Sequence, residues 1–205
     1  MIKAVIFDFD KTLYSGISWK KWNDFAIDAL SNAVKSPEKL AELVEKYALK
    51  TDASQLVLAD ICGKEGINFR KVRRYLKIHI CPLQAKEGKK LATISNEFLM
   101  GLSKKYPVYL LSLSEKKHIK FYAKKYGISL KPFKKVITVN PLHRSKAIEM
   151  EKIVKNEKLK PEEVLMVGDN PITDIAPAQR LGLQSFYFQE DYNELYDFFR
   201  SLTNI

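Results

Sequence analysis

The chain has 205 residues, of which 46% are hydrophobic and 29% charged, proportions typical of a globular protein with one sizeable core. No apolar run approaches the roughly 20 residues that a membrane-spanning helix needs, and the N-terminus lacks a secretion-signal pattern. The 35 basic and 24 acidic residues give a net charge of +11, and the two cysteines, Cys62 and Cys81, have no metal-ligand spacing. We therefore expect a cytoplasmic protein with reduced thiols, neither membrane-bound nor built on disulfides.

An apolar run, Ala4 to Phe7, begins almost at the N-terminus and ends in two carboxylates, Asp8 and Asp10. The run is β-branched and aromatic and has no polar alternation, which is typical of a strand buried on both faces of a parallel sheet. Open α/β sheets bind their ligands at the carboxyl ends of such strands. Two carboxylates this close are costly unless a divalent cation or a shared proton compensates them. The sequence therefore predicts a functional site at this strand end.

The next segment, residues 15–106, shows helical periodicity and no strand pattern. Ser36 and Pro37 have the residue types of a helix cap and a first helical position. Pro82 is expected to end another helix. The predicted helices cover residues 19–34, 37–47, 54–62, 69–80 and 87–104. We therefore expect a helical insertion packed as a bundle.

From Pro107 onward, short apolar strands alternate with helices. The predicted strands cover 108–113, 135–139, 164–167 and 184–188, and the predicted helices cover 115–126, 145–158, 172–181 and 193–202. This alternation indicates βαβ units, a parallel sheet and right-handed crossovers. The predicted fold is therefore α/β, with a core domain from 1–14 and 107–205. Residues 15–106 form a small all-helical domain whose last helix can pack on the core.

A second acidic motif follows the predicted strand at 164–167. Gly168 lets the backbone turn sharply, and Asp169 is thereby delivered to the same sheet edge as Asp8. Asp174 lies early in the following helix, where the helix dipole favours a negative charge. Asp174 or Thr173 could instead simply cap that helix, although capping leaves the Gly-Asp pair at the strand end unexplained.

A hydroxyl and a basic residue complete the set of candidate site residues. Ser112 directly ends the apolar run 108–111, and Ser114 is a competing candidate. Lys146 begins a helix 23 residues before Asp169, with Arg144 as a near alternative. A fixed cation at this place would offset the negative charge of the carboxylates.

Taken in order, these motifs resemble those of the haloacid dehalogenase (HAD) superfamily: Asp-x-Asp-x-Thr-Leu at 8–13, a hydroxyl at a strand end, a lysine on a helix, and Gly-Asp-x4-Asp at 168–174. The resemblance covers nearly the whole chain, with the helical insertion similar in type to a cap domain. It implies a HAD-like (Rossmannoid) three-layer core. Three positions depart from the family pattern: Lys11 replaces a frequent Gly, Leu113 a frequent Asn, and Ala147 a common Pro.

The resemblance implies a Mg²⁺-dependent phosphatase that cleaves a small phosphorylated metabolite. Asp8 would attack phosphorus and form an aspartyl-phosphate, while Asp10 would act first as general acid and then as general base. Clustered negative charge would raise the pKa of Asp10 and keep it protonated when substrate binds. The implied metal ligands are Asp8, Asp10, Asp169 and Asp174, and the implied phosphate contacts are Ser112 and Lys146. Family members that displace halide lack an acid at the place of Asp10, because halide needs no proton.

Two other functions stay open. One is a phosphotransferase or phosphomutase of the same superfamily, and the other is a nucleic-acid or polyanion-binding protein built on this fold. The second depends on a lysine block in which Glu115 is the sole acid and the lysines are numbers 104, 105, 116, 117, 120, 124, 125, 131, 134 and 135. A solvated helix face explains this block more simply, so nucleic acid is not the expected partner. The sequence leaves both a monomer and a homodimer open.

Overall fold

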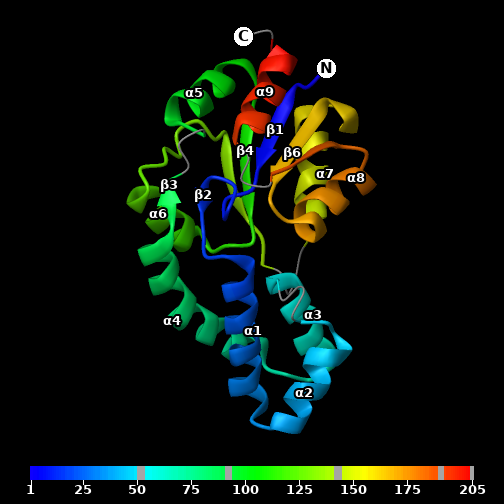
Figure 1. The fold of residues 1–205 in the computed structure, drawn as a ribbon. Coiled ribbons are helices and arrows are strands. Elements are labelled where there is room, and N and C mark those ends of the chain that lie inside the picture. Colours follow the sequence, from blue (N-terminus) through cyan, green and yellow to red (C-terminus); the bar gives the residue numbers. More distant parts are fainter. Residues whose placement is uncertain (50–53, 91–93, 141–144, 189–191, 204–205) are drawn as a thin grey trace. The chain divides into compact units, whose positions relative to one another are not determined.

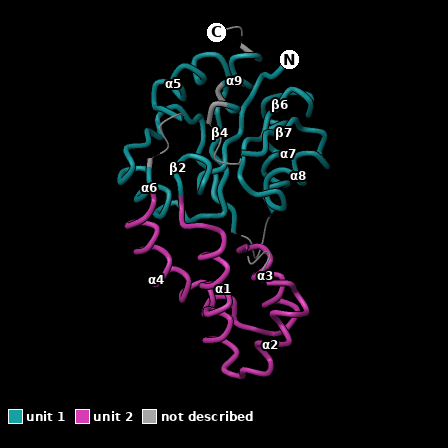
Figure 2. The backbone as a smooth tube through the Cα atoms, viewed as in Figure 1, with its two compact units in different colours: residues 1–15, 89–205 teal, residues 16–88 magenta. Residues whose placement is uncertain are grey.

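The computed structural model describes residues 1–49, 54–90, 94–140, 145–188 and 192–203 (Figure 1). The chain divides into two compact units, and Figure 2 colours them separately. Unit 1 combines residues 1–15 with 89–205, and unit 2 covers residues 16–88. The helix that follows Ser95 therefore belongs to unit 1.

Unit 1 is built on a five-stranded parallel sheet in the order β5-β4-β1-β6-β7. Its strands are β1 (Ala4–Phe7), β4 (Val108–Ser112), β5 (Lys135–Thr138), β6 (Val164–Gly168) and β7 (Gln184–Tyr187). The three central strands β4, β1 and β6 are buried along their whole length, as continuous apolar runs require. The predicted α/β fold with a parallel sheet is confirmed.

Helices cover both faces of this sheet and give three layers (Figure 1). They are α5 (Asn96–Lys105), α6 (Lys116–Lys125), α7 (Lys146–Glu157), α8 (Ala176–Arg180) and α9 (Tyr192–Thr203). On one face, α7 and α8 pack against the side chains of Ala4 and Ile6. On the other face, Phe7 stacks on Phe199 of α9, with ring centroids 6.1 Å apart. The alternation of side chains along β1 therefore fills both layers.

The strand register determines which residues reach the carboxyl edge of the sheet. Phe7 lies opposite Leu110 of β4 and Val167 of β6. The backbone N–H of Asp8 continues the ladder and donates to the carbonyl of Val167 at 2.9 Å. The segments that follow these three neighbouring strands therefore begin at the same edge.

Unit 2 consists of α1 (Trp19–Val34), α2 (Pro37–Lys46), α3 (Gln55–Lys64) and α4 (Phe69–Glu87). Its helices enclose a separate apolar core that includes Leu30, Leu43 and Leu58, all fully buried. Ser36 caps α2, as predicted, by accepting a hydrogen bond from the Lys39 backbone at 3.2 Å. Cys62 is buried in this core and is a free thiol. Among the described residues, no helix has the length and apolarity to cross a membrane.

The predicted end of a helix at Pro82 is wrong, because α4 continues to Glu87. A proline inside a helix loses one hydrogen bond and displaces the carbonyl four residues earlier, here that of Ile78. Ile78 is 56% exposed, so water can satisfy this carbonyl. The buried face of α4 includes Ile80 and Gln84, on either side of the proline, and its burial keeps the helix continuous.

The predicted helix at 87–104 is also wrong in its first part, and so is the prediction that no strand interrupts 15–106. A two-residue strand β3 (Lys89–Lys90) pairs antiparallel with β2 (Tyr14–Ser15). Helix α5 begins only at Asn96, where Ser95 caps it. Strands of two residues are too short to show alternation, so the sequence gives no signal for this ribbon.

Candidate functional site

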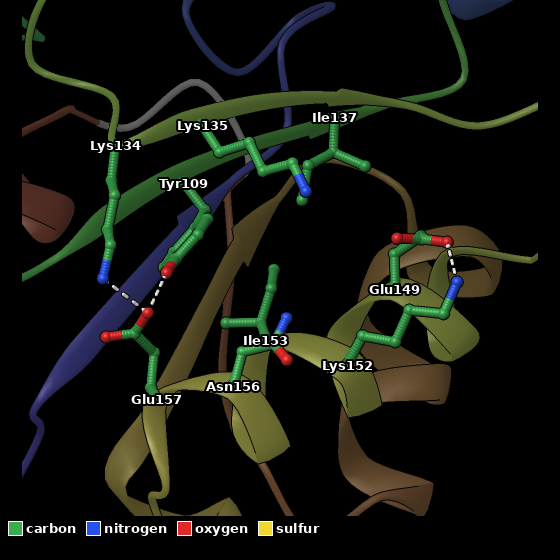
Figure 3. A pocket seen from close by; sticks show the side chains of 9 residues that line it. All are labelled: Tyr109, Lys134, Lys135, Ile137, Glu149, Lys152, Ile153, Asn156 and Glu157. Atoms are coloured by element: carbon green, nitrogen blue, oxygen red, sulfur yellow. Dashed lines mark hydrogen bonds and ion pairs between the residues drawn. The ribbon is translucent and has the colours of Figure 1, made fainter.

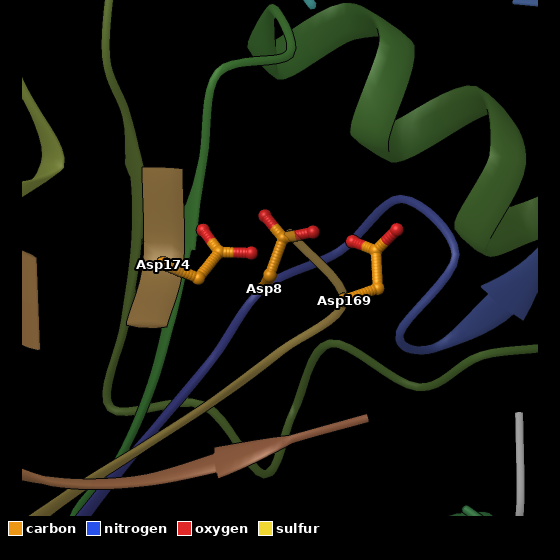
Figure 4. A group of neighbouring side chains, drawn as sticks. All are labelled: Asp8, Asp169 and Asp174. Atoms are coloured by element: carbon orange, nitrogen blue, oxygen red, sulfur yellow. The ribbon is translucent and has the colours of Figure 1, made fainter. Parts of the chain in front are cut away.

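Three carboxylates meet at the carboxyl edge of the sheet in unit 1 (Figure 4). Asp8 follows β1, Asp169 follows β6, and Asp174 lies in a π-helical turn, Pro171–Ile175, that precedes α8. Each of them offers one oxygen, and these three oxygens lie within 4.8 Å of one another. Asp8 and Asp174 are buried and Asp169 is half-buried. Because neighbouring parallel strands end at the same edge of the sheet, three acids separated by up to 166 positions in the sequence, from 8 to 174, come together.

Lys146 holds two of these acids. Its Nζ lies 2.5 Å from Asp8 Oδ1 and 2.6 Å from Asp174 Oδ1, and its side chain is only 3% exposed. Lys146 is the first residue of α7, a position where the helix dipole disfavours a cation. The negative charges of Asp8 and Asp174 offset this unfavourable interaction of Lys146 with the helix dipole. Arg144, the alternative from the sequence, lies outside the described residues.

The backbone around Asp174 is arranged by Asn170 and Gly168. Asn170 caps the π-helical turn, since its Oδ1 accepts hydrogen bonds from Ile172 and Thr173 at 2.9 Å each. Asn170 therefore supplies the main cap of this turn, and Asp174 adds to it by accepting a hydrogen bond from the Asn170 backbone N–H at 3.1 Å through Oδ2, while its Oδ1 faces Lys146. A Cβ added at Gly168 would lie 2.6 Å from Asp174 Cγ. The backbone of Gly168 is not left-handed, so glycine is needed for the close approach of Asp174, and the predicted sharp turn is not its role.

The acid cluster carries more negative charge than Lys146 neutralises. Burial raises the pKa of Asp8 to about 7; Lys146 opposes this rise, while Asp174 and Asp10 add to it. Burial, Asp8 and Asp174 also hold the pKa of Asp169 well above its usual range, against the charges of Lys11 and Lys146. Carboxylate oxygens are the ligands that Mg²⁺ prefers. The donor set of three acids around one buried edge therefore fits a divalent cation.

Asp10 has a different environment, although it is only two residues from Asp8. Its Oδ1 accepts a hydrogen bond from the Tyr14 hydroxyl at 2.5 Å and lies 3.4 Å from His118 Nε2. Its Oδ2 accepts from Ser114 Oγ at 2.6 Å and from Ser112 Oγ at 3.3 Å. All four partners lie in unit 1: Tyr14 begins β2, Ser112 and Ser114 lie at and just after the end of β4, and His118 lies on α6.

These partners overturn the expectation that clustered charge raises the pKa of Asp10. Burial alone would raise this pKa, but His118, Ser114 and Tyr14 together hold it well below its usual range. From the sequence, Asp8 is the evident neighbour of Asp10. The hydrogen-bond donors from other segments, such as His118 and Ser114, are not evident from the sequence. Without a ligand, Asp10 is therefore an anion held by hydroxyls and an imidazole.

The structure places both candidate serines at the site. Ser112 is 1% exposed and Ser114 is 8% exposed, and both donate to the same oxygen of Asp10. Ser112 Oγ also accepts a hydrogen bond from the Ser114 backbone N–H at 3.0 Å. The geometry leaves the choice between them as phosphate contacts open.

Sequence reasoning missed Tyr14 and His118 as neighbours of Asp10, and it noted Lys11 only as a departure from the family pattern. Tyr14 directly follows the Asp-x-Asp-x-Thr-Leu motif, and its pKa is raised by burial and by Asp10, so the phenol stays a donor. His118 lies in the first turn of α6, the helix after β4, and this position was a usable signal because that turn starts near the site edge. Lys11 has a left-handed backbone (φ 60°), which favours the glycine common there in the resembled family.

Away from the acid cluster, a pocket of about 360 Å³ lies between β4, β5 and α7 (Figure 3). Glu157 in its wall accepts from Lys134 at 2.7 Å and from the hydroxyl of Tyr109. Glu149 is paired with Lys152 at 2.7 Å. The carboxylates of this pocket are thus neutralised by lysines, in contrast to the acid cluster after β1 and β6.

The lysine block between residues 104 and 135 lies at the surface. All ten of its lysines are exposed, and seven of them lie within α6 or at the end of α5. Their exposure agrees with a solvated surface, which is the simpler interpretation.

Comparisons with known proteins support one family. The family model for haloacid dehalogenase-like hydrolases matches residues 2–182 of the chain. Among curated proteins, no sequence matches it.

Solved structures of this family have a similar fold. A haloacid dehalogenase-like hydrolase from Streptococcus pneumoniae is 20% identical, with a TM-score of 0.55 over 94% of this chain and 90% of that one. A family enzyme from Bacteroides thetaiotaomicron, in complex with magnesium and inorganic phosphate, is 17% identical, with a TM-score of 0.52 over 93% and 96%. A 2-haloacid dehalogenase from Pseudomonas syringae is 17% identical, with a TM-score of 0.51 over 92% and 86%. At these identities the similarity shows the fold alone.

Proposed function

The chain belongs to the haloacid dehalogenase-like hydrolases, and on this premise we propose that it is a Mg²⁺-dependent phosphatase acting on a small phosphorylated metabolite. The observation that carries the proposal is the pairing of two differently placed acids on one strand end. Asp8 lies among carboxylates and a buried lysine, and Asp10 lies among proton donors. Phosphoryl transfer to a carboxylate needs both a nucleophile and a separate acid-base group.

Asp8 is the proposed nucleophile. Lys146 Nζ, 2.5 Å from Asp8 Oδ1, holds the side chain in one orientation. In the proposed first step, Asp8 attacks phosphorus, the bond to the leaving alcohol breaks, and an aspartyl-phosphate forms. The positive charge of Lys146 also stabilises the charge that develops on the phosphoryl oxygens. Water then attacks phosphorus and restores the free carboxylate.

Asp10 is the proposed acid and base. The negative charge of a bound phosphate ester opposes ionisation of a nearby carboxyl, so substrate binding would raise the low pKa of Asp10 and allow it to take up a proton. Asp10 would donate this proton to the leaving alcohol and then accept one from the attacking water. A halide leaves without a proton, so a dehalogenase reaction would not use Asp10 as a general acid.

Mg²⁺ is the proposed cofactor, with Asp8, Asp169, Asp174 and the Asp10 backbone as its proposed ligands. When bound, the ion supplies the positive charge that lets an anionic nucleophile approach an anionic phosphate. Burial, and after it the neighbouring carboxylates, raise the pKa of Asp8 and of Asp169, and a bound cation would favour the ionised form of both. The phosphate complex of the Bacteroides relative agrees with the proposed substrate class.

The proposed cap of the enzyme is the helical insertion, predicted from the sequence at residues 15–106; helices α1 to α4 form unit 2, residues 16–88, whereas α5 belongs to unit 1. Closing a cap over an active site excludes water and provides specificity contacts.

The test is hydrolysis of a panel of phosphorylated sugars, nucleotides and small acids, with 4-nitrophenyl phosphate as a generic ester, in Mg²⁺ and in EDTA. We expect Mg²⁺-dependent release of phosphate from at least one member. A 2-haloacid serves as the control, and release of halide with no release of phosphate would overturn the proposal. Adding a sugar alcohol tests the phosphotransferase alternative, because an acceptor that competes with water yields a new phosphate ester.

A further inference from the structure

Both oxygens of the Asp10 carboxylate are engaged by side chains from separate segments. Tyr14 approaches Oδ1 at 2.5 Å, with His118 Nε2 at 3.4 Å from the same atom. Ser114 and Ser112 donate to Oδ2. A carboxylate that accepts on both oxygens has little freedom to rotate, because rotation would break hydrogen bonds that are stronger than neutral ones.

The two partners of Oδ1 are themselves fixed by an aromatic stack on α6. The Tyr14 ring lies almost parallel to that of Tyr122, with centroids 5.3 Å apart and an interplanar angle of 6°. It also stacks on Tyr126 at 5.0 Å. His118 lies against Tyr122 at 4.4 Å. Positions 118 and 122 lie in α6 and position 126 is its C-cap; the three are four residues apart, so they form a stripe along one face of the helix and its end.

We propose that Tyr14 and His118 are positioning residues that orient the Asp10 carboxylate toward the leaving oxygen of the substrate, with the aromatic stripe of α6 holding both in place. This inference depends on the proposed acid-base role of Asp10. Neither residue belongs to the motifs that assign the family, and neither touches the reacting atoms in this proposal.

A purely structural role is the competing explanation. A fully buried tyrosine needs a hydrogen-bond partner for its hydroxyl, and Asp10 could serve only that need. The two roles differ in what they predict for catalysis. A structural partner affects all substrates alike, whereas a group that orients the general acid matters most where the leaving group needs a proton.

The main test uses Tyr14→Phe, which keeps the stacking ring and removes the hydroxyl. With an alkyl phosphate ester, we expect kcat to fall by about 10- to 100-fold, a part of what general acid catalysis contributes, while KM changes little. With 4-nitrophenyl phosphate, the single-turnover burst of nitrophenolate should keep its rate, because this leaving group departs without a proton. The matched control is Tyr109→Phe, which removes another hydroxyl that donates to a carboxylate, that of Glu157 in the separate pocket, and should retain wild-type kcat with both esters.

His118 provides a second, independent variant. His118→Ala should reproduce the selective loss with the alkyl ester, and His118→Gln, which restores an amide donor, should recover part of it. Thermal unfolding of every variant with and without Mg²⁺ separates lost positioning from lost folding.

The outcomes separate a failure of the positioning role from a failure of the proposed phosphatase function. Equal losses in the alkyl-ester kcat and in the nitrophenolate burst rate, a loss shared by Tyr109→Phe, or wild-type kcat with the alkyl ester in both Tyr14→Phe and His118→Ala would overturn this inference alone. A wild-type protein that hydrolyses neither ester would overturn the proposed function and this inference with it.

Discussion

Asp8 and Asp10 are two residues apart, yet they lie in opposite electrostatic environments. The Asp8 side chain is 7% exposed and lies among two further carboxylates and one lysine, which leaves its pKa raised to about 7. The Asp10 side chain is 28% exposed and lies among hydroxyls and an imidazole, which hold its pKa below the usual range. The neighbours that each carboxylate receives from distant segments, more than its residue type, therefore decide its chemistry.

The strand order explains this difference. Strand β1 lies between β4 and β6, so the turn after it receives different partners from its two sides. The acidic partners of Asp8 come from the segment after β6, and its lysine begins α7. The serines and the histidine of Asp10 come from the end of β4 and from α6. A sheet with another strand order would not separate the two environments in this way.

The largest expected effect comes from exchanging the two acids, one at a time, for asparagine. Asp8→Asn should lower turnover of 4-nitrophenyl phosphate by roughly 10⁴- to 10⁶-fold, because the nucleophile is lost. Asp10→Asn should still form the phosphorylated enzyme with this good leaving group and release phosphate slowly. Rapid-quench trapping of the phosphorylated protein distinguishes the two. If Asp8→Asn traps phosphate as well, Asp8 is not the nucleophile.

Removing Lys146 tests how strongly the Asp8 side of the site depends on this buried cation. Lys146→Met leaves Asp8 and Asp174 without their shared partner, and we expect the free energy of unfolding to fall by about 3–5 kcal/mol. Denaturant unfolding in EDTA measures this loss, and Mg²⁺ should restore part of it.

Lys152→Met is the matched control for this variant, on the same helix. Lys152 is 48% exposed and pairs with Glu149 at 2.7 Å, so its loss should cost less than about 0.5 kcal/mol. Similar losses in the two variants would contradict a special role for the buried cation.

A pH titration of stability should show the raised pKa of Asp8. In EDTA the folded protein holds a proton on Asp8 up to about pH 7, whereas the unfolded chain releases it near its ordinary pKa of 3.8. The native state therefore binds more protons in this window, and stability should decline as the pH rises toward about 7. Asp10 has the opposite sign, and its contribution is lost only in strong acid.

Mg²⁺ should reverse this decline, because metal binding requires ionised carboxylates. The measurement is the unfolding temperature between about pH 5 and pH 8, with Mg²⁺ or EDTA, in the wild type and in Asp8→Asn. The stabilisation by Mg²⁺ should be larger at the higher pH and should shrink in the variant. A Mg²⁺ effect that is independent of pH would contradict the assignment of the proton to Asp8.

The sequence could predict the convergence of Asp8, Asp169 and Asp174, because strand ends in a parallel sheet meet at one edge and each acid follows a recognisable apolar run. Their roles as nucleophile and metal ligands stay predictions. The partners of Asp10 could not be derived in the same way. Tyr14 and His118 reach it through a turn and through the rotation of α6 about its axis, and neither is encoded in strand periodicity.

The fold shows the same limit. Long periodic segments such as α1 were predicted within a residue or so, because an apolar face fixes their extent. The two-residue strands β2 and β3 have no periodicity to detect, and the continuation of α4 past Pro82 depends on the burial of its far side. Local signals therefore fail where tertiary packing outweighs them.

The smallest expected effect decides which serine belongs to the Asp10 side of the site. Ser114 Oγ is 2.6 Å from Asp10 Oδ2, while Ser112 Oγ is 3.3 Å away, so the Ser112 hydroxyl is more easily turned toward a bound phosphate. Ser112→Ala should raise the inhibition constant of inorganic phosphate about tenfold, the value of one hydrogen bond to a charged group. Ser114→Ala should leave that constant within about threefold and should instead lower kcat with an alkyl ester, because Asp10 loses its closest partner on Oδ2. In the reverse result, Ser114→Ala would weaken the binding of inorganic phosphate and Ser112→Ala would lower kcat. That result would make Ser114 the phosphate contact and Ser112 the partner of Asp10.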